Sequence, residues 1–207
     1  MITNDNINKL IKMAEGFGAD VLCVAEVLLY NPNFGECWGG LAGQHHAFNG
    51  GLALHTKEVT DIAFSSSKVL KLDIDKIELF LACLYHDAGK TFDYVKNPSY
   101  GVTCYSLENG CALEPEPQYI ASPHKRLIHH ISRSAIMWSH AISNYPVLEH
   151  KYHDTVLHAI LAHHGHREWG SPVAPKTKTA WLLHLSDGIS ARMNDADITD
   201  QLKRENK

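Results

Sequence analysis

Hydrophobic residues recur at helical spacing along most of this chain, beginning near its N-terminus. Two such rows are formed by Ile7, Leu10, Ile11 and Ala14 and by Val21, Leu22, Ala25, Leu28 and Leu29. The segment Gly16-Phe17-Gly18 separates the rows. Since side chains three and four residues apart share one face of a helix, residues 5–30 predict two amphipathic helices.

The same spacing predicts further helices over residues 52–71, 74–88, 122–144, 154–165 and 176–193. Their expected boundaries are Asp73 as an N-cap, Gly89 as a stop, Ser122-Pro123 as a cap and first turn, and Asp154 as another N-cap. Residues 31–51 are rich in glycine, asparagine and proline and are predicted to be a loop. The polar residues from Asp195 onward are expected to fray.

Residues 91–122 interrupt the helical pattern. They contain several prolines and the turn-like segment Glu108-Asn109-Gly110, which predicts an irregular excursion with a short hairpin around residues 103–113. No segment has a convincing parallel-strand pattern. Five to seven helices therefore predict an all-α fold, an irregular helical bundle. At 207 residues we expect one domain, with N-terminal helices in 1–30, a core in 34–194 and a polar tail in 195–207.

Composition narrows the functional classes. A net charge of −4 argues against a broad basic surface, and therefore against strong non-specific binding to duplex nucleic acid. No apolar run is long enough to span a bilayer, and the N-terminus lacks a secretory signal, so we expect a cytoplasmic protein without a membrane partner. The five cysteines form no CxxC pair, which favours reduced thiols over a disulfide framework. Oligomeric state is left open.

The 15 histidines are the unusual feature, because neutral imidazole is a common metal ligand. His86 and Asp87 stand at the end of an apolar helix whose inward face includes Leu79 and Cys83. A buried imidazole beside a buried carboxylate is costly without a partner, and a divalent cation would supply one. The alternative is a helix end that carries polar His-Asp-Lys side chains.

Two other apolar rows are each interrupted by one polar residue. His55 lies in the row of Leu52 and Val59, and Asp187 lies among alanines and leucines of the last predicted helix. A lone histidine on such a face can also be a hydrogen-bonded core residue. One shared metal site, however, explains His55, the His86-Asp87 pair and Asp187 together.

Adjacent histidines extend this set. His130 faces inward, whereas His129 shares its face with basic residues, and His163 or the neighbouring His164 ends another helix. Either pair could instead decorate the surface or the core. With the four residues above, they supply enough ligands for two divalent ions, which could be Mn, Fe, Co, Ni, Zn or Mg, with Asp87 placed to bridge them.

The order of these residues resembles the H…HD…D signature of the HD superfamily of metal-dependent phosphohydrolases. More closely, five motifs in 34–194 resemble the catalytic domain of YhaM-type 3′-5′ exoribonucleases. They are HHAFNGGLALHT from His45, YHDAGK from Tyr85, LIHHI from Leu127, HHGHREWGSP from His163 and LLHLSDGISARM from Leu182.

The resemblance implies metal ligation by His55, His86, Asp87 and Asp187, with His130 and His163 or His164 completing a second position, and Lys90 facing the substrate phosphate. This chain departs from the family at His129-His130, where a Gly-His pair is usual, and in the length of residues 91–122. Because the first 30 residues have a helical pattern, we do not expect them to form the N-terminal oligonucleotide-binding barrel of that family, and the sequence shows no aromatic and basic strip that would hold a single strand.

Our leading hypothesis is phosphodiester hydrolysis by a metal-activated water, with short single-stranded nucleic acid as the substrate. Asp87 and Lys90 are the expected catalytic residues, and Lys90, Arg167 and His46 the expected substrate-binding residues, with Arg133 a weaker candidate. His45 and His46 could instead cap the helix after Gly50-Gly51, and Trp169 could stack a base or pack under its loop. The alternatives are a nucleotide or deoxynucleotide phosphohydrolase and a non-catalytic regulatory domain that retains a metal for structure.

Overall fold

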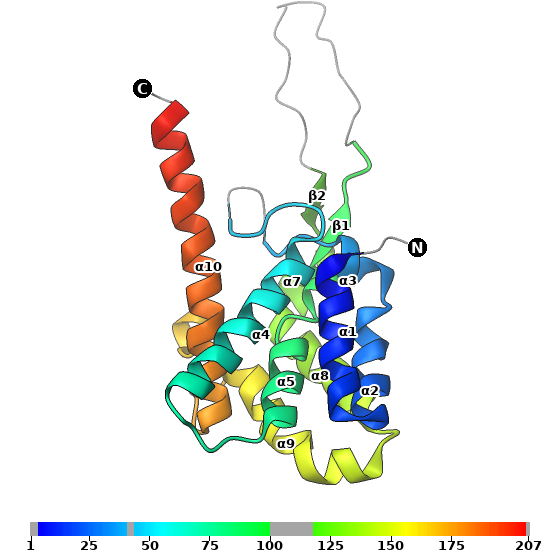
Figure 1. The fold of residues 1–207 in the computed structure, drawn as a ribbon. Coiled ribbons are helices and arrows are strands. Elements are labelled where there is room, and N and C mark those ends of the chain that lie inside the picture. Colours follow the sequence, from blue (N-terminus) through cyan, green and yellow to red (C-terminus); the bar gives the residue numbers. More distant parts are fainter. Residues whose placement is uncertain (1–3, 41–43, 100–117, 206–207) are drawn as a thin grey trace, which may run out of the picture.

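The computed structural model describes residues 4–40, 44–99 and 118–205, which form a helical bundle with one small sheet (Figure 1). The helices are α1 (Asp5–Phe17), α2 (Ala19–Leu29), α3 (Pro32–Glu36), α4 (Gly51–Val69), α5 (Lys76–Tyr85), α6 (Lys90–Asp93), α7 (Pro123–Leu127), α8 (His130–Ile142), α9 (Pro146–Ala162), the 3-10 helix η1 (Arg167–Trp169) and α10 (Lys178–Glu205). The strands are β1 (Tyr94–Lys96) and β2 (Tyr119–Ala121). The predicted all-α fold class is confirmed.

The helices α4 and α5 occupy the middle of the bundle (Figure 1). The long helix α10 packs along α4, α5 and α9, while α1 and α2 pack on one another and lie on the opposite side of α4 and α5. Fully buried Leu52, Leu79, Val156 and Leu183 lie in one core formed by these helices. The central helices therefore face neighbours on several sides, and polar residues on their inward faces are enclosed.

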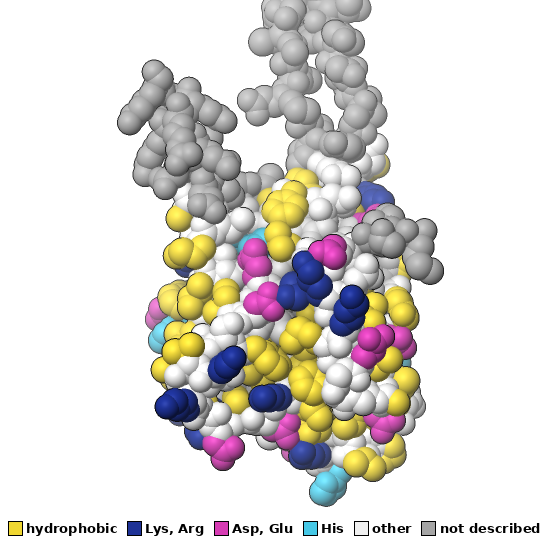
Figure 2. Space-filling model, in the orientation of Figure 1, with side chains coloured by type: hydrophobic (Ala, Val, Ile, Leu, Met, Phe, Trp, Pro, Cys, Tyr) yellow, Lys and Arg dark blue, Asp and Glu magenta, His cyan; other side chains and the backbone are white. Residues whose placement is uncertain are grey.

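The outer face formed by α1, α4 and α5 carries mixed charge. Figure 2 shows Lys and Arg side chains interspersed with Asp and Glu and with hydrophobic side chains. On α1, Lys9 forms an ion pair with Asp5. It is therefore not a broad basic surface, as the net charge of −4 predicts.

Helix boundaries correct several predictions. The N-cap of α5 is Asp75 and not Asp73, because the Asp75 carboxylate accepts hydrogen bonds from the amides of Ile77 and Glu78. Asp154 caps no helix, since α9 begins at Pro146, where proline is well suited to the first turn. Residues 31–51 contain the short helix α3, which starts after the N-cap Asn31.

The predicted helix 122–144 is two helices. Ser122 and Pro123 open α7 as predicted, but Ile128 and His129 adopt extended backbone conformations and α8 starts at His130. The break redirects the chain so that His130 is buried while His129 is exposed. His130 therefore points inward as predicted, but because it starts a new helix and not because it lies on the inner face of one continuous helix.

The last helix is longer than predicted. Residues from Asp195 onward do not fray but extend α10 to Glu205, because no proline or glycine interrupts this segment. Its C-terminal part projects past the other helices (Figure 1). None of the helices in the described part of the chain has the length and apolar character needed to cross a membrane.

The 91–122 excursion contains the only sheet of the described residues. Strands β1 and β2 pair antiparallel, with Tyr94 opposite Ala121 and Lys96 opposite Tyr119. The hairpin predicted around 103–113 lies outside the described residues. Of the cysteines, Cys23, Cys37 and Cys83 are free thiols, in agreement with the predicted absence of a disulfide framework among them.

Candidate metal centre

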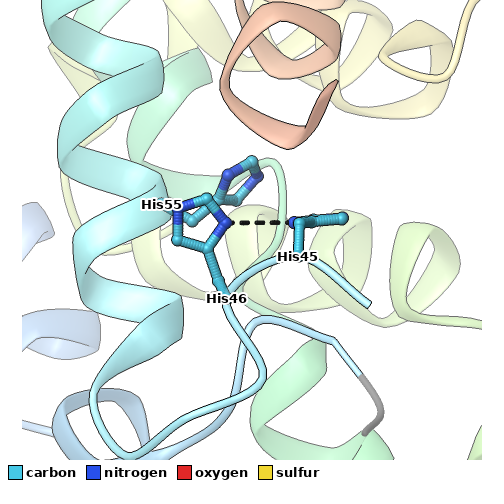
Figure 3. Close-up of side chains that lie close together, drawn as sticks. All are labelled: His45, His46 and His55. Atoms are coloured by element: carbon cyan, nitrogen blue, oxygen red, sulfur yellow. Dashed lines mark hydrogen bonds between the residues drawn. The ribbon is translucent and has the colours of Figure 1, made fainter. Parts of the chain in front are cut away.

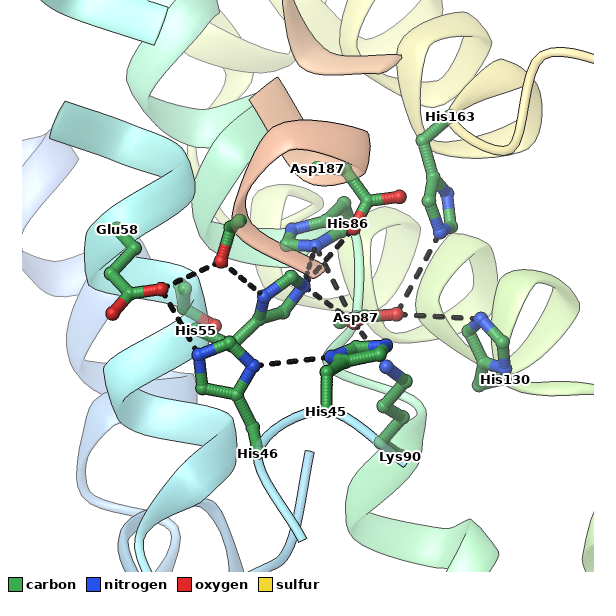
Figure 4. A network of polar contacts seen from close by, with 12 residues as sticks. His45, His46, His55, Glu58, His86, Asp87, Lys90, His130, His163 and Asp187 are labelled. Carbon is green, nitrogen blue, oxygen red and sulfur yellow. Dashed lines mark hydrogen bonds and ion pairs between the residues drawn. The ribbon is translucent and has the colours of Figure 1, made fainter. Parts of the chain in front are cut away.

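Four predicted ligands from three helical segments meet in the interior (Figure 4). His55 comes from α4, His86 and Asp87 follow α5, and Asp187 comes from α10. Nε2 of His55 lies 3.4 Å from Asp87 Oδ2 and 3.1 Å from Asp187 Oδ1, and Nε2 of His86 lies 3.4 Å from Asp87 Oδ2. These four side chains can place one ligand atom each within 4.8 Å of one another. The arrangement suits a divalent cation that accepts nitrogen and oxygen ligands.

A second group adjoins the first. His130 begins α8, and His163 and His164 follow the end of α9. Nε2 of His130 lies 3.4 Å from Nε2 of His164 and 3.3 Å from Asp87 Oδ1, while Nε2 of His163 lies 3.7 Å from the same oxygen. The sequence left open whether His163 or His164 would join the site, and the structure brings both to it.

Asp87 separates the two groups with its carboxylate. Oδ2 faces His55 and His86, whereas Oδ1 faces His130 and His163. Within the described residues, neither Asp87 Oδ1 nor His163 Nε2 has a hydrogen-bond partner, although both atoms are buried. Buried polar atoms without partners are costly and rare. Bound divalent cations would satisfy them, so the residues present fit a metal centre.

Backbone carbonyls orient three of the imidazoles. Nδ1 of His86 donates to Cys83 O, Nδ1 of His163 to Ile160 O and Nδ1 of His164 to Trp169 O, at distances of 2.7, 2.7 and 2.6 Å. A proton held on Nδ1 leaves the lone pair of Nε2 directed into the centre. Such hydrogen bonds fix the tautomer and the ring orientation of metal-binding histidines. Sequence reasoning missed them because they depend on how each helix ends.

His55 is oriented by side chains. Its Nδ1 lies 2.9 Å from the hydroxyl of Ser190, which donates to Glu58 Oε2 at 2.7 Å. Ser190 follows Asp187 by three residues on α10, and Glu58 follows His55 by three on α4. These two residues were missed, although their spacing on the same helices is a usable signal.

Asp93 is a further missed residue. Its buried carboxylate lies 3.6 Å from Nδ1 of His130. Burial raises the pKa of this carboxyl to about 6, although the positive charges of Lys125 and Lys90 oppose the shift. Among the described residues, neither oxygen of Asp93 has a hydrogen-bond partner, so Asp93 places a carboxyl group beside His130 without the hydrogen bond that the carbonyls make to the other imidazoles. It stands six residues after Asp87, on the turn of α6 that packs against α8.

The electrostatics of the centre suit cation binding. Burial lowers the pKa of His130 well below its ordinary value and that of His164 to about 4, so both imidazoles are neutral at neutral pH, as metal ligation requires. Burial alone would raise the pKa of the Asp87 carboxyl, but the charges of Lys90 and His86 hold it well below its usual range. The carboxylate is thus ionised.

A cavity of about 600 Å³ opens beside the centre. Its lining residues are His45, Lys90, His164, Trp169, His184, Leu185, Asp187, Gly188, Ile189, Ala191, Arg192 and Met193. Lys90 is predominantly buried, and its Nζ lies 2.6 Å from Asp87 Oδ2. Of the predicted substrate-binding residues, Lys90 is therefore the one that both lines the cavity and contacts the Asp87 carboxylate.

The other predicted substrate contacts lie elsewhere. Arg167 is exposed on η1, and neither it nor His46 is among the residues that line the cavity. The guanidinium of Arg133 lies 4.8 Å from the centre of the Phe92 ring and faces that side chain. His45 lines the cavity in the place where the sequence suggested His46.

A family model described as the HD domain matches residues 52–192, which is more than half of the chain. The chain belongs to the HD domain family. HD domains are in general metal-dependent phosphohydrolases, and the ligand groups around Asp87 are consistent with that chemistry. A search of solved structures gave no significant match to the chain.

A third histidine group, drawn in Figure 3, consists of His55 in the matched region and of His45 and His46, which precede it. Nδ1 of His45 and Nδ1 of His46 lie 3.1 Å apart, and Nε2 of His46 lies 3.0 Å from Glu58 Oε2. Both ring nitrogens of His46 thus have hydrogen-bond partners, in contrast to His163. Neither histidine caps α4, whose N-cap Gly50 has no side-chain hydrogen bond. We assign this group to the support of His55 and not to another metal.

Gly89 makes the centre possible by letting the turn after Asp87 pack tightly on α8. A methyl group at this position would lie well inside the van der Waals contact distance of His130 O and 2.8 Å from Arg133 Cβ. We expect Gly89→Ala to destabilise the HD domain by about 1–3 kcal/mol, because an overpacked core must shift. The shift would move α8, and with it His130, away from Asp87.

Urea unfolding and elemental analysis of the purified Gly89→Ala variant measure the two effects. Gly16→Ala is the control, because a methyl group there meets no atom within 4 Å. Equal stability and equal metal content in the wild type and Gly89→Ala would contradict the packing argument.

Proposed function

We propose that this HD domain hydrolyses the phosphodiester bonds of short single-stranded nucleic acid from the 3′ end, with two divalent ions. The supporting observation is the buried carboxylate of Asp87, whose two oxygens face two separate ligand groups while Lys90 contacts it from the cavity side. Such a bridged pair suits the in-line displacement at phosphorus that two-metal hydrolases perform.

The geometry supports the following assignment of ligands. We assign the first ion to His55, His86, Asp87 and Asp187, and the second to Asp87, His130, His163 and His164. Divalent ions at such a centre supply Lewis-acid polarisation of phosphoryl oxygens and a more acidic water. The backbone and side-chain hydrogen bonds to Nδ1 hold the imidazoles in place, so little reorganisation is needed during the reaction.

Lys90 acts on the substrate. Its ammonium group stands between Asp87 and the cavity, where it can pair with a non-bridging phosphate oxygen as charge develops there. The aliphatic part of its side chain is buried, which restricts the group to this place. Asp87 and Lys90 are therefore the residues that we propose as catalytic.

The substrate class rests on the cavity and on the resemblance to YhaM-type exoribonucleases. A volume of about 600 Å³ falls within the usual range of small-molecule sites and admits a mononucleotide unit. The nucleotide phosphohydrolase alternative uses the same centre and would also fit. The exposed indole of Trp169 at the cavity favours a substrate with a base to stack.

We expect the metal-loaded protein to shorten a 5′-labelled single-stranded oligonucleotide stepwise and to release mononucleotides. The test compares RNA and DNA strands with a panel of nucleoside and deoxynucleoside mono-, di- and triphosphates. Release of inorganic phosphate from the nucleotides, with both strands left intact, would replace the proposal by the nucleotide phosphohydrolase alternative.

A further inference from the structure

Four aromatic rings meet on the outer side of the cavity. Trp169 on η1 and Trp181 on α10 are 57% and 49% exposed. The half-buried ring of His184 lies between them, with ring centroids 6.5 Å from Trp169 and 5.9 Å from Trp181, and the ring of His166 lies 4.8 Å from Trp169. We call these four residues the aromatic strip.

Two hydrogen bonds anchor part of the aromatic strip. Nδ1 of His184 donates to His163 O at 2.8 Å, and Nδ1 of His164 donates to Trp169 O at 2.6 Å. Gly165 has a φ of 80°, and a methyl group on it would collide with the His184 ring, so the loop from His163 can approach α10 only with glycine there. One loop, residues 163–169, therefore carries both His163 and His164 of the second ligand group and Trp169 of the strip.

The strip continues along α10 as an apolar surface. Leu185, Ile189 and Met193 are exposed and line the cavity at successive intervals of four residues. From Trp181 to Met193 the helix rises by about 18 Å at 1.5 Å per residue. Single exposed hydrophobic residues are ordinary, but a continuous row beside a cavity marks a binding surface.

Charge and position identify the occupant. Lys90 and Arg192 line the same cavity, where Lys90 pairs with Asp87 and Arg192 with Asp195, and Arg167 is exposed on η1 two residues before Trp169. A row of flat rings bordered by cations fits a strand that alternates stacking bases with phosphates. A protein partner could bind to the apolar surface, but it would not account for the continuation of this surface into the cavity that contains Lys90.

We propose that the aromatic strip and the adjoining face of α10 bind single-stranded nucleic acid by base stacking and lead its end to the metal centre. This inference rests on the proposed phosphodiesterase function. Trp181, one turn outside the cavity, would hold a base beyond the nucleotide that is cleaved.

The test uses Trp181→Ala and Trp181→Phe, with Tyr30→Ala as the control at an exposed aromatic residue of α2's C-terminus. Trp181→Ala should weaken binding of a fluorescent phosphorothioate strand, which resists hydrolysis, about tenfold, the usual scale of one stacked base. Phenylalanine should retain most of the affinity, and Tyr30→Ala all of it. With a hydrolysable strand, the loss should fall on KM and not on kcat.

The outcomes separate this inference from the proposed function. Loss of strand binding in Trp181→Ala without any hydrolysis of strands by the wild type would support the strip and refute the exonuclease. Hydrolysis of strands with equal affinity in all variants would refute the strip alone. A change in molar mass of Trp181→Ala by light scattering, with strand affinity unaltered, would show that the surface joins two copies of the chain and would also refute it.

Discussion

Asp87→Asn should lower phosphodiester hydrolysis by at least about a thousandfold, since loss of one catalytic hydrogen-bond donor alone costs about 10²–10³ in other hydrolases. The amide cannot bridge two cations with two anionic oxygens, because only one of its terminal atoms is an acceptor. Both ligand groups contact this side chain, one through Oδ1 and the other through Oδ2. Both metal positions should therefore be weakened by a change of a single functional group.

The measurements are the initial rate on a labelled strand and on a generic aryl phosphodiester, and the metal content by elemental analysis. Asp154→Asn is the matched control, because Asp154 is an exposed acid on α9 whose partner is the neighbouring His153. Two outcomes would contradict the assignment. Unchanged activity and metal content in Asp87→Asn would do so, and a fully metal-loaded wild type without hydrolytic activity would instead favour the regulatory-domain alternative.

The placement of His55, Asp187 and the His86-Asp87 pair could be predicted because each interrupts an apolar helical row. Periodicity tells which face of a helix is buried, and a polar residue on that face needs a partner. The structure brings these residues together from α4, α5 and α10. Their roles as ligands stay predictions until metal is measured.

Helix ends were harder to predict. Asp154 is a residue type that often caps helices, yet α9 starts eight residues earlier at Pro146. Capping preferences say which residue types suit a helix start, but they do not say which of several suitable residues is used. The break at His129 was missed because the packing of α8 decides where that helix starts. The extension of α10 was missed because its polar residues form no apolar row, although no proline or glycine stops the helix there. The carbonyls that orient the histidines lie at these same ends.

The aromatic strip could not be read from the chain. Trp169 and Trp181 stand on separate segments, and only the close approach of Gly165 to His184 brings them together. A sequence pattern reports spacing within one helix, whereas this surface depends on contact between a loop and a helix. The failure to recognise an aromatic strip in the sequence was therefore no argument against nucleic acid as the substrate.

Removal of metal should abolish hydrolysis and lower stability together. A ligand that binds only the folded state at about a thousand times its Kd stabilises it by about 4 kcal/mol, and for a chain of this size that corresponds to a fall in Tm of about 10 °C on removal. The centre lies at the junction of α4, α5, α8, α9 and α10, so the ions would link the whole bundle. Without them, the unpartnered Asp87 Oδ1 and His163 Nε2 remain buried at a cost.

Chelation with EDTA, followed by thermal unfolding and activity measurement, tests both effects, and EDTA already saturated with metal serves as the control. Return of Mn, Fe, Co, Ni, Zn or Mg one at a time should restore stability and activity in the same order, because both depend on occupation of the same ligands. Full activity and an unchanged Tm in the chelated protein would show that neither catalysis nor folding depends on a metal at this centre.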